Sequence, residues 1–92
     1  MIEISFSTSF RKAFKRKVRG NPTLEERFWE RVEIFENNPF DPSLRPHKIN
    51  RLTSLYKRPV WSVTIAGNLR AVFLVKGNQV ISLDIGSHDI YK

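Results

Sequence analysis

The chain has 92 residues, no cysteine, 40% hydrophobic residues and a formal net charge of +7. A chain of this size forms one domain over residues 1–92 with a single modest core, and the lack of cysteine excludes a disulfide scaffold and thiolate metal sites. No stretch is apolar enough for a signal peptide or a membrane span, so we expect a soluble, cytoplasmic protein.

The charge is distributed unevenly along the chain. Residues 8–20 hold six basic side chains and no acidic one, residues 21–41 hold six acidic ones against two arginines, and residues 42–92 hold eight basic ones against two acids. Two positive segments therefore flank a negative one. The natural partner is a polyanion, either nucleic acid or an acidic protein or both, although charge alone does not distinguish these from a merely soluble basic surface.

The first half of the chain predicts one strand and two helices. Residues 2–6 alternate apolar and polar side chains, which indicates a half-buried strand. The Ser-Thr-Ser run at 7–9 can cap a helix that reaches about residue 19, with Phe10, Phe14 and Val18 on one face. The "NPT" segment at 21–23 starts a second helix, which "NNPFDP" ends. So short a link predicts an antiparallel helical hairpin packed on a sheet.

The second half predicts four strands, over "HKINRL", "VWSVTIAG", "NLRAVFLVKG" and "NQVISLDIG". Gly-Asn pairs at 67–68 and 77–78 are typical of two-residue hairpin turns. The order is β-α-α-β-β-β-β, which predicts an α+β fold with a helical hairpin on one face of a mainly antiparallel, twisted sheet and the other face free. Alternation along the third of these strands places Arg70 on the face opposite Phe73.

The segments "ISFSTSFRKAFKRK", "NPTLEERFWERVEIFENNPFDPSLRPHKI", "NLRAVFLV" and "IGSHDIY", in this order, make the chain resemble the RelE/ParE superfamily of type II toxin-antitoxin systems. The resemblance runs from Ile4 to Tyr91, and "PHKI" and "SHDIY" are most similar to the nuclease branch near YafQ. It implies a toxin that cleaves mRNA, usually in the ribosomal A site, and that a cognate antitoxin holds inactive by wrapping it with an acidic or amphipathic segment.

RNA cleavage without a metal requires a base for the 2′-OH proton, cations for the phosphate and an acid for the leaving 5′-oxygen. The resemblance assigns the acid to His88, the base or substrate orienter to His47, and the phosphate contact to Arg70. Tyr91 is expected to stack on a base or to donate to the phosphate, or else to plug the core. Asp89 either orients His88 or bonds locally in a turn.

Backbone phosphates are expected to meet four lysines and arginines, namely Lys48, Arg51, Lys57 and Lys92. No metal or organic cofactor is expected, because two histidines and scattered acids lack ligand spacing. The chain departs from several nuclease relatives in having Asp84 and Ser87 ahead of His88, where those relatives carry a further basic residue. Two other interpretations stay open: a ParE-like toxin that inhibits DNA gyrase by binding, and an inert protein that only pairs with an antitoxin and DNA.

Overall fold

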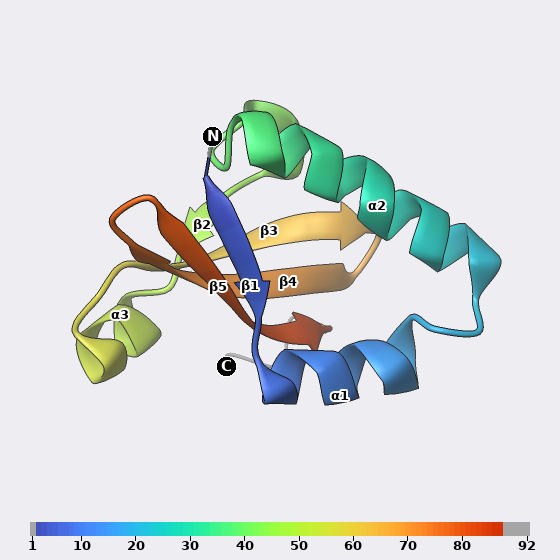
Figure 1. Ribbon diagram of the computed structural model, residues 1–92, viewed down its shortest axis with the longest axis horizontal. Coiled ribbons are helices and arrows are strands. Elements are labelled where there is room, and N and C mark those ends of the chain that lie inside the picture. The colour runs from blue at the N-terminus through green and yellow to red at the C-terminus, as the bar shows by residue number, and fades with distance from the viewer. Residues whose placement is uncertain (1, 88–92) are drawn as a thin grey trace.

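The computed structural model describes residues 2–87 and shows an α+β fold (Figure 1). Its elements are β1 (Glu3–Phe6), α1 (Thr8–Lys17), α2 (Pro22–Asn37), the 3₁₀-helix η1 (Pro42–Leu44), β2 (His47–Lys48), α3 (Asn50–Tyr56), β3 (Val60–Ala66), β4 (Leu69–Lys76) and β5 (Gln79–Gly86). Within this range the strands form one five-stranded sheet in the order β1-β5-β4-β3-β2. β1 runs parallel to β5 and the other neighbours are antiparallel, which confirms the predicted, mainly antiparallel sheet.

Local sequence signals account for the ends of the two long helices. The Ser7 hydroxyl accepts a hydrogen bond from Phe10 N at 3.1 Å, and the Asn21 side chain accepts one from Leu24 N at 3.2 Å. Each bond satisfies a backbone donor that the first helical turn leaves free. Gly20, with φ +94°, allows the tight link between the helices.

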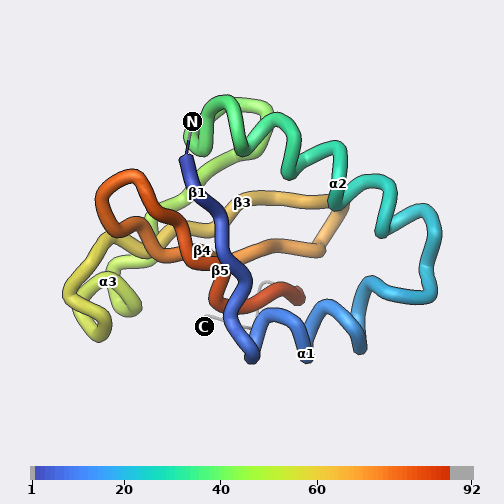
Figure 2. The backbone as a smooth tube through the Cα atoms, viewed as in Figure 1, coloured from blue at the N-terminus to red at the C-terminus, as the bar shows by residue number. Residues whose placement is uncertain are grey.

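The two helices cover the same face of the sheet but diverge from one another, as Figures 1 and 2 show. α1 packs on β5 and α2 packs on β3, so the predicted hairpin is splayed. Phenylalanine rings fill the space between the helices, and the ring centroids of Phe14 and Phe28 lie 4.9 Å apart. The splay follows from this filling, because bulky rings on both apolar stripes keep the helix axes apart.

The main core lies between these helices and the sheet face that they cover, which we call the helix face. It includes Phe10, Phe28, Phe35, Phe73 and Ile85, all buried. A smaller cluster on the opposite face, here the second face, contains Ile49, Val60, Val72 and Leu74, with Leu52 packed against it.

The expectation of a strand over "HKINRL" and of a free second face is wrong in part. Strand β2 ends at Lys48: Ile49 N–H still bonds to Val60 O at 2.8 Å in the same register, but the Ile49 carbonyl then accepts a hydrogen bond from Thr53 N at 2.9 Å, which begins a helix. The chain then forms α3, which covers the second face at the Val60 end. Ile49, Leu52 and Thr53 have the i, i+3, i+4 spacing of a short helix, which is too few residues to distinguish a one-to-two-turn helix from a strand by periodicity.

Two hairpin turns and the 3₁₀-helix η1 connect further elements. Gly67 and Gly77 have φ of +51° and +63°, which confirms the two predicted hairpin turns. Before β2, η1 places Leu44 in the main core with no exposed surface. Its cap is Asp41, whose carboxylate accepts hydrogen bonds from the Ser43 hydroxyl and N–H, and these bonds hold the pKa of Asp41 below its usual value.

Candidate functional site

Arg70 lies near the start of β4 on the second face, opposite to Phe73 as the alternation predicts. The β-sheet register places it between Thr64 of β3 and Gly86 of β5. Its Nη1 donates to Thr64 Oγ1 at 3.5 Å, while its Nε is buried and has no hydrogen-bond partner within residues 2–87. A buried donor without a partner costs free energy. Because Nε is covered, an anion that arrives from outside meets the half-buried guanidinium at its Nη groups.

His47 is the first residue of β2 and is exposed. It lies directly opposite Ser62 of β3, and Ser62 and Thr64 share the second face. Because directly opposed residues of an antiparallel pair project to the same face, His47 and Arg70 lie on one face of the sheet. Strand spacing and rise place their Cα atoms roughly 12 Å apart, a separation that leaves room for a phosphodiester between the two side chains.

The C-terminal candidates lie outside the described residues. These are His88, Asp89, Tyr91 and Lys92, and their predicted roles stay predictions. The structure does describe where the chain approaches them: β5 ends at Gly86, the direct neighbour of Arg70 across the strands. The chain therefore leaves the sheet beside Arg70, two residues before His88.

The predicted phosphate contacts within the described range are spread around β2 and α3. Lys48 pairs with Trp61 and so projects to the helix face, away from His47. Arg51 is exposed on α3, and Lys57 is exposed at the end of that helix in a left-handed conformation with φ +57°. Residues 45–58 contain five basic side chains and no acidic one, so this part of the surface is uniformly positive.

The sequence did not lead us to predict two polar residues near Arg70, Ser62 and Thr64, and a third, Asp84, was considered only for its charge. Ser62 and Thr64 lie on the second face, and their i, i+2 spacing within the apolar strand "VWSVTIA" is the signal that could have indicated them. Asp84 pairs with Val72 next to a bulge in β5 and so shares the second face. Its carboxylate accepts a hydrogen bond from Ile85 N at 2.8 Å, which occupies one oxygen locally.

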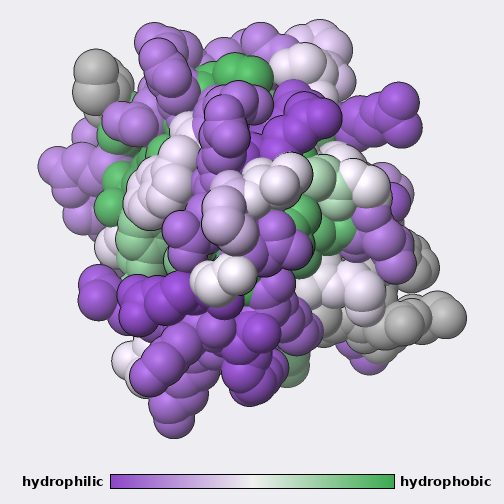
Figure 3. All heavy atoms as spheres, turned by 90° about the vertical axis from the view of Figure 1, so that its right-hand side faces the viewer, coloured by the Kyte–Doolittle hydropathy of each residue, from purple (hydrophilic) through white to green (hydrophobic). Residues whose placement is uncertain are grey.

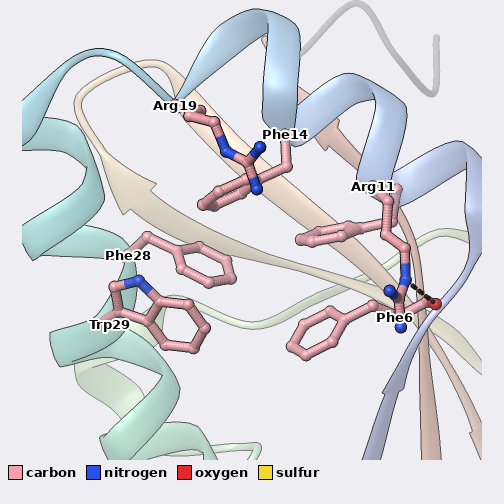
Figure 4. Close-up of a pocket in the computed structure, with 7 residues that line it drawn as sticks. Phe6, Arg11, Phe14, Arg19, Phe28 and Trp29 are labelled. Atoms are coloured by element: carbon pink, nitrogen blue, oxygen red, sulfur yellow. Dashed lines mark hydrogen bonds between the residues drawn. The ribbon is translucent and has the colours of Figure 1, made fainter.

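A second feature is a hollow of about 240 Å³ between α1 and α2, which we call the aromatic groove (Figure 4). It is lined by Phe6, Phe10, Arg11, Phe14, Arg19, Phe28 and Trp29. Trp29 is 55% exposed, which is a large apolar surface for a residue on a small domain. Figure 3 shows the side of the molecule that lies at the right in Figure 1. This side is mostly hydrophilic, with apolar surface between the polar side chains.

The α1 side of the aromatic groove is basic. Arg11 and Arg19 approach it from α1 and the link that follows, and α1 also exposes Lys12, Lys15 and Arg16. Arg11 is held at the groove by a bond from its Nε to Phe6 O at 3.2 Å. On the α2 side the groove is lined by Phe28 and Trp29, and the exposed glutamates of α2 do not line it. The groove therefore combines an apolar floor with arginines on one side.

Residues 2–87 contain no group of three or more histidine, cysteine or acidic side chains that could hold a metal ion. Over the same range, none of the helices has the length and apolar character needed to cross a bilayer.

Within the described residues the protein has an α+β fold, with a mixed five-stranded sheet, two helices on one face and a short helix on the other. No protein-family model and no curated protein matches the sequence, but solved structures match the fold. The YoeB–YefM complex from Staphylococcus aureus has a TM-score of 0.71 at 20% identity over 96% of this chain and 98% of that one.

Two further structures share the fold. The YoeB/ParE toxin from Agrobacterium tumefaciens has a TM-score of 0.72 at 15% identity, covering 95% of this chain and 99% of that one. The DinJ–YafQ complex from Escherichia coli has a TM-score of 0.64 at 14% identity, covering 97% and 96%. At these identities the likeness shows the fold alone, and it confirms the predicted RelE-like α+β fold.

Proposed function

We propose that this protein is the toxin of a type II toxin-antitoxin module and that it cleaves mRNA in the ribosomal A site without a metal ion. The observation that carries the proposal is the place of Arg70, a half-buried cation on the second face that lies beside Gly86, at the strand end that leads to His88. Its planar fork matches two phosphate oxygens at once.

In the proposed reaction, His47 accepts the proton of the 2′-OH or orients the nucleotide that carries it. The 2′-oxygen then attacks the adjacent phosphorus while the bond from phosphorus to the 5′-oxygen breaks. His88 donates a proton to that leaving oxygen, and the products are a 2′,3′-cyclic phosphate and a 5′-hydroxyl. Arg70 stabilises the negative charge that builds on the phosphate oxygens in the transition state.

The remaining candidates hold the RNA around this centre. Tyr91 stacks on an unpaired base or donates to the phosphate, and Asp89 orients the His88 ring. The backbone phosphates meet Arg51, Lys57 and Lys92, and they meet Lys48, which projects to the helix face, where the RNA passes the edge strand β2. The positive segment 45–58 supports this assignment, because a strand of RNA that enters between His47 and Arg70 passes close to α3.

The antitoxin is proposed to dock in the aromatic groove. Its apolar floor fits one bulky side chain, since about 240 Å³ is smaller than the usual pocket for a whole small molecule. Arg11 and Arg19 at the groove, with the other basic residues of α1, attract acidic residues of a peptide. An amphipathic antitoxin segment with an apolar anchor flanked by acids on the α1 side fits this arrangement. Two of the solved neighbours contain a second protein, YefM and DinJ.

The test is to incubate the purified protein with translating ribosomes and a defined mRNA in the absence of added metal, and to map RNA ends by primer extension. Cuts at fixed codon positions are expected for the wild type and are expected to vanish in His88→Ala and Arg70→Ala. Arg27→Ala, an exposed arginine on α2, is the matched control and should cut normally. Intact RNA under conditions where the wild type arrests growth would contradict the proposal.

A second candidate is a ParE-like toxin that binds and inhibits DNA gyrase without cutting RNA. Asp84 on the second face favours it, because a carboxylate near Arg70 opposes the charge that a phosphate needs, and one neighbour is itself named a YoeB/ParE toxin. Inhibition of gyrase supercoiling that persists in His88→Ala would support this function and exclude the nuclease as the cause of toxicity.

A further inference from the structure

β3 presents two hydroxyl side chains to the second face, each directly across from a residue of the proposed site. Thr64 lies opposite Arg70 of β4 and accepts its Nη1 hydrogen bond at 3.5 Å. Ser62, two residues earlier on the same strand, lies opposite His47 of β2. The strand thus pairs one hydroxyl with each of the two candidates that the described residues contain.

Ser62 is buried in a way that calls for an explanation. It has no exposed surface, and its Oγ has no hydrogen-bond partner within residues 2–87. On the β4 side it faces Val72, which is apolar, so the polar side chain across from it is His47. An apolar residue would fill this position at lower cost, because a buried hydroxyl without a partner destabilises the folded state.

Ser62 Oγ and the His47 ring do not hydrogen-bond in this structure. We propose that Ser62 is a positioning residue for His47, through a hydrogen bond between its hydroxyl and a ring nitrogen that forms when the exposed ring turns toward β3. Directly opposed residues have Cβ atoms about 4.5–5.5 Å apart, which brings the hydroxyl and the imidazole within reach. A hydroxyl both donates and accepts, so it can fix the ring orientation and the nitrogen that carries the proton. Because Ser62 is fully buried, it acts through His47 and not on the RNA.

The pairing is tested first without reference to activity, by NMR of the ¹⁵N-labelled full chain at a fixed pH. His88→Ala assigns the ring signals of the two histidines. Ser62→Ala is expected to shift the His47 ring-nitrogen resonances, because the balance between its tautomers changes. Ser82→Ala is the matched control, since Ser82 is also buried in a strand but lines the helix face. His47 resonances that do not move in Ser62→Ala would overturn the inference.

The effect on catalysis rests on the proposed function and is tested by single-turnover RNA cleavage. Ser62→Ala is expected to lower the rate on the order of tenfold, as loss of orientation does, while its unfolding midpoint stays equal or rises. In a His47→Ala background the same substitution is expected to cause no further loss. Equal losses in both backgrounds would overturn the inference. If the wild type cleaves no RNA, the proposed function fails, and the NMR result still decides whether Ser62 positions His47.

Discussion

At the scale of single residues, Arg70 illustrates why charge alone does not define a phosphate site. Its guanidinium is fixed by β4, by the Thr64 hydroxyl and by burial of Nε, so two of its nitrogens already have a defined direction. A lysine at this position would keep the charge but would present a single, strongly hydrated ammonium group on a flexible stem. The geometry of the fork, and not only its charge, is therefore expected to matter.

This argument predicts the effect of Arg70→Lys. The variant should fold normally and cleave RNA on the order of 10²-fold more slowly than the wild type, because one oriented donor to the transition state is lost. The measurement is single-turnover cleavage of mRNA on ribosomes, with circular dichroism as the check of folding. Cleavage at the wild-type rate would show that a point charge suffices and would contradict the assigned role of the fork.

At the scale of elements, α3 is held to the sheet by the hydroxyl of Thr53 in addition to its apolar packing, and this hydroxyl also donates to Val60 O at 3.5 Å. Val60 N donates to Thr53 Oγ1 at 3.0 Å, and Val60 has no exposed surface. The contact thus satisfies a buried donor at the start of β3 and ties the helix to the strand that carries Ser62 and Thr64. Its loss would affect both the stability of the domain and the placement of the second-face residues.

Substitution of Thr53 tests this tie. Thr53→Val keeps the shape of the side chain but leaves Val60 N–H without its acceptor, and we expect a loss of about 1–3 kcal/mol in the free energy of unfolding. Thr53→Ser keeps the hydroxyl and is expected to lose much less. Urea denaturation followed by tryptophan fluorescence measures both. Equal stability of the two variants would show that the hydrogen bond contributes nothing.

At the scale of the whole molecule, charge is divided among surfaces. The positive segment 45–58 borders the second face, whereas the acids of residues 21–41 are carried mainly by α2 on the helix face. The proposed function therefore assigns RNA and the antitoxin to different surfaces: the nucleic acid to β2 and α3, and the antitoxin to the aromatic groove beside α1. Binding of RNA through this surface should weaken as salt rises, because phosphate contacts release counterions.

Substitution of Lys57 affects the charge of the surface and the stability of the domain, and the two effects can be measured separately. Lys57 is a non-glycine residue with φ +57°. Lys57→Gly should raise stability by up to about 1 kcal/mol, since glycine adopts this conformation without steric cost. It should also reduce the salt dependence of single-stranded RNA binding by a slope of about 0.7, the value for one phosphate contact.

Arg45→Gly is the control for Lys57→Gly, since Arg45 has φ +50° and no assigned contact to RNA. It should give the same gain in stability, and because Arg45 belongs to the positive segment but has no assigned phosphate contact, it should change the salt slope less than Lys57→Gly does. Stability is measured by urea denaturation and binding by fluorescence anisotropy at several salt concentrations. A salt slope that Lys57→Gly leaves unchanged would exclude Lys57 from the RNA surface.

Much of the fold could be predicted because it follows from local patterns. The caps at Ser7 and Asn21, the glycine turns at 67 and 77, and the alternation that places Arg70 opposite Phe73 depend on a few consecutive residues each. Short-range sterics and hydrogen bonding decide such features before any tertiary contact forms.

The sequence by itself determined the order of most elements, the face that Arg70 occupies and the separation of charge along the chain. Only the tertiary structure decided that β2 ends at Lys48, that the two long helices splay around their phenylalanine rings, and that Ser62 lies opposite His47. These features depend on strand register and on packing between distant segments. Local patterns do not specify register, because several alignments of the same alternating strands bury the same side chains.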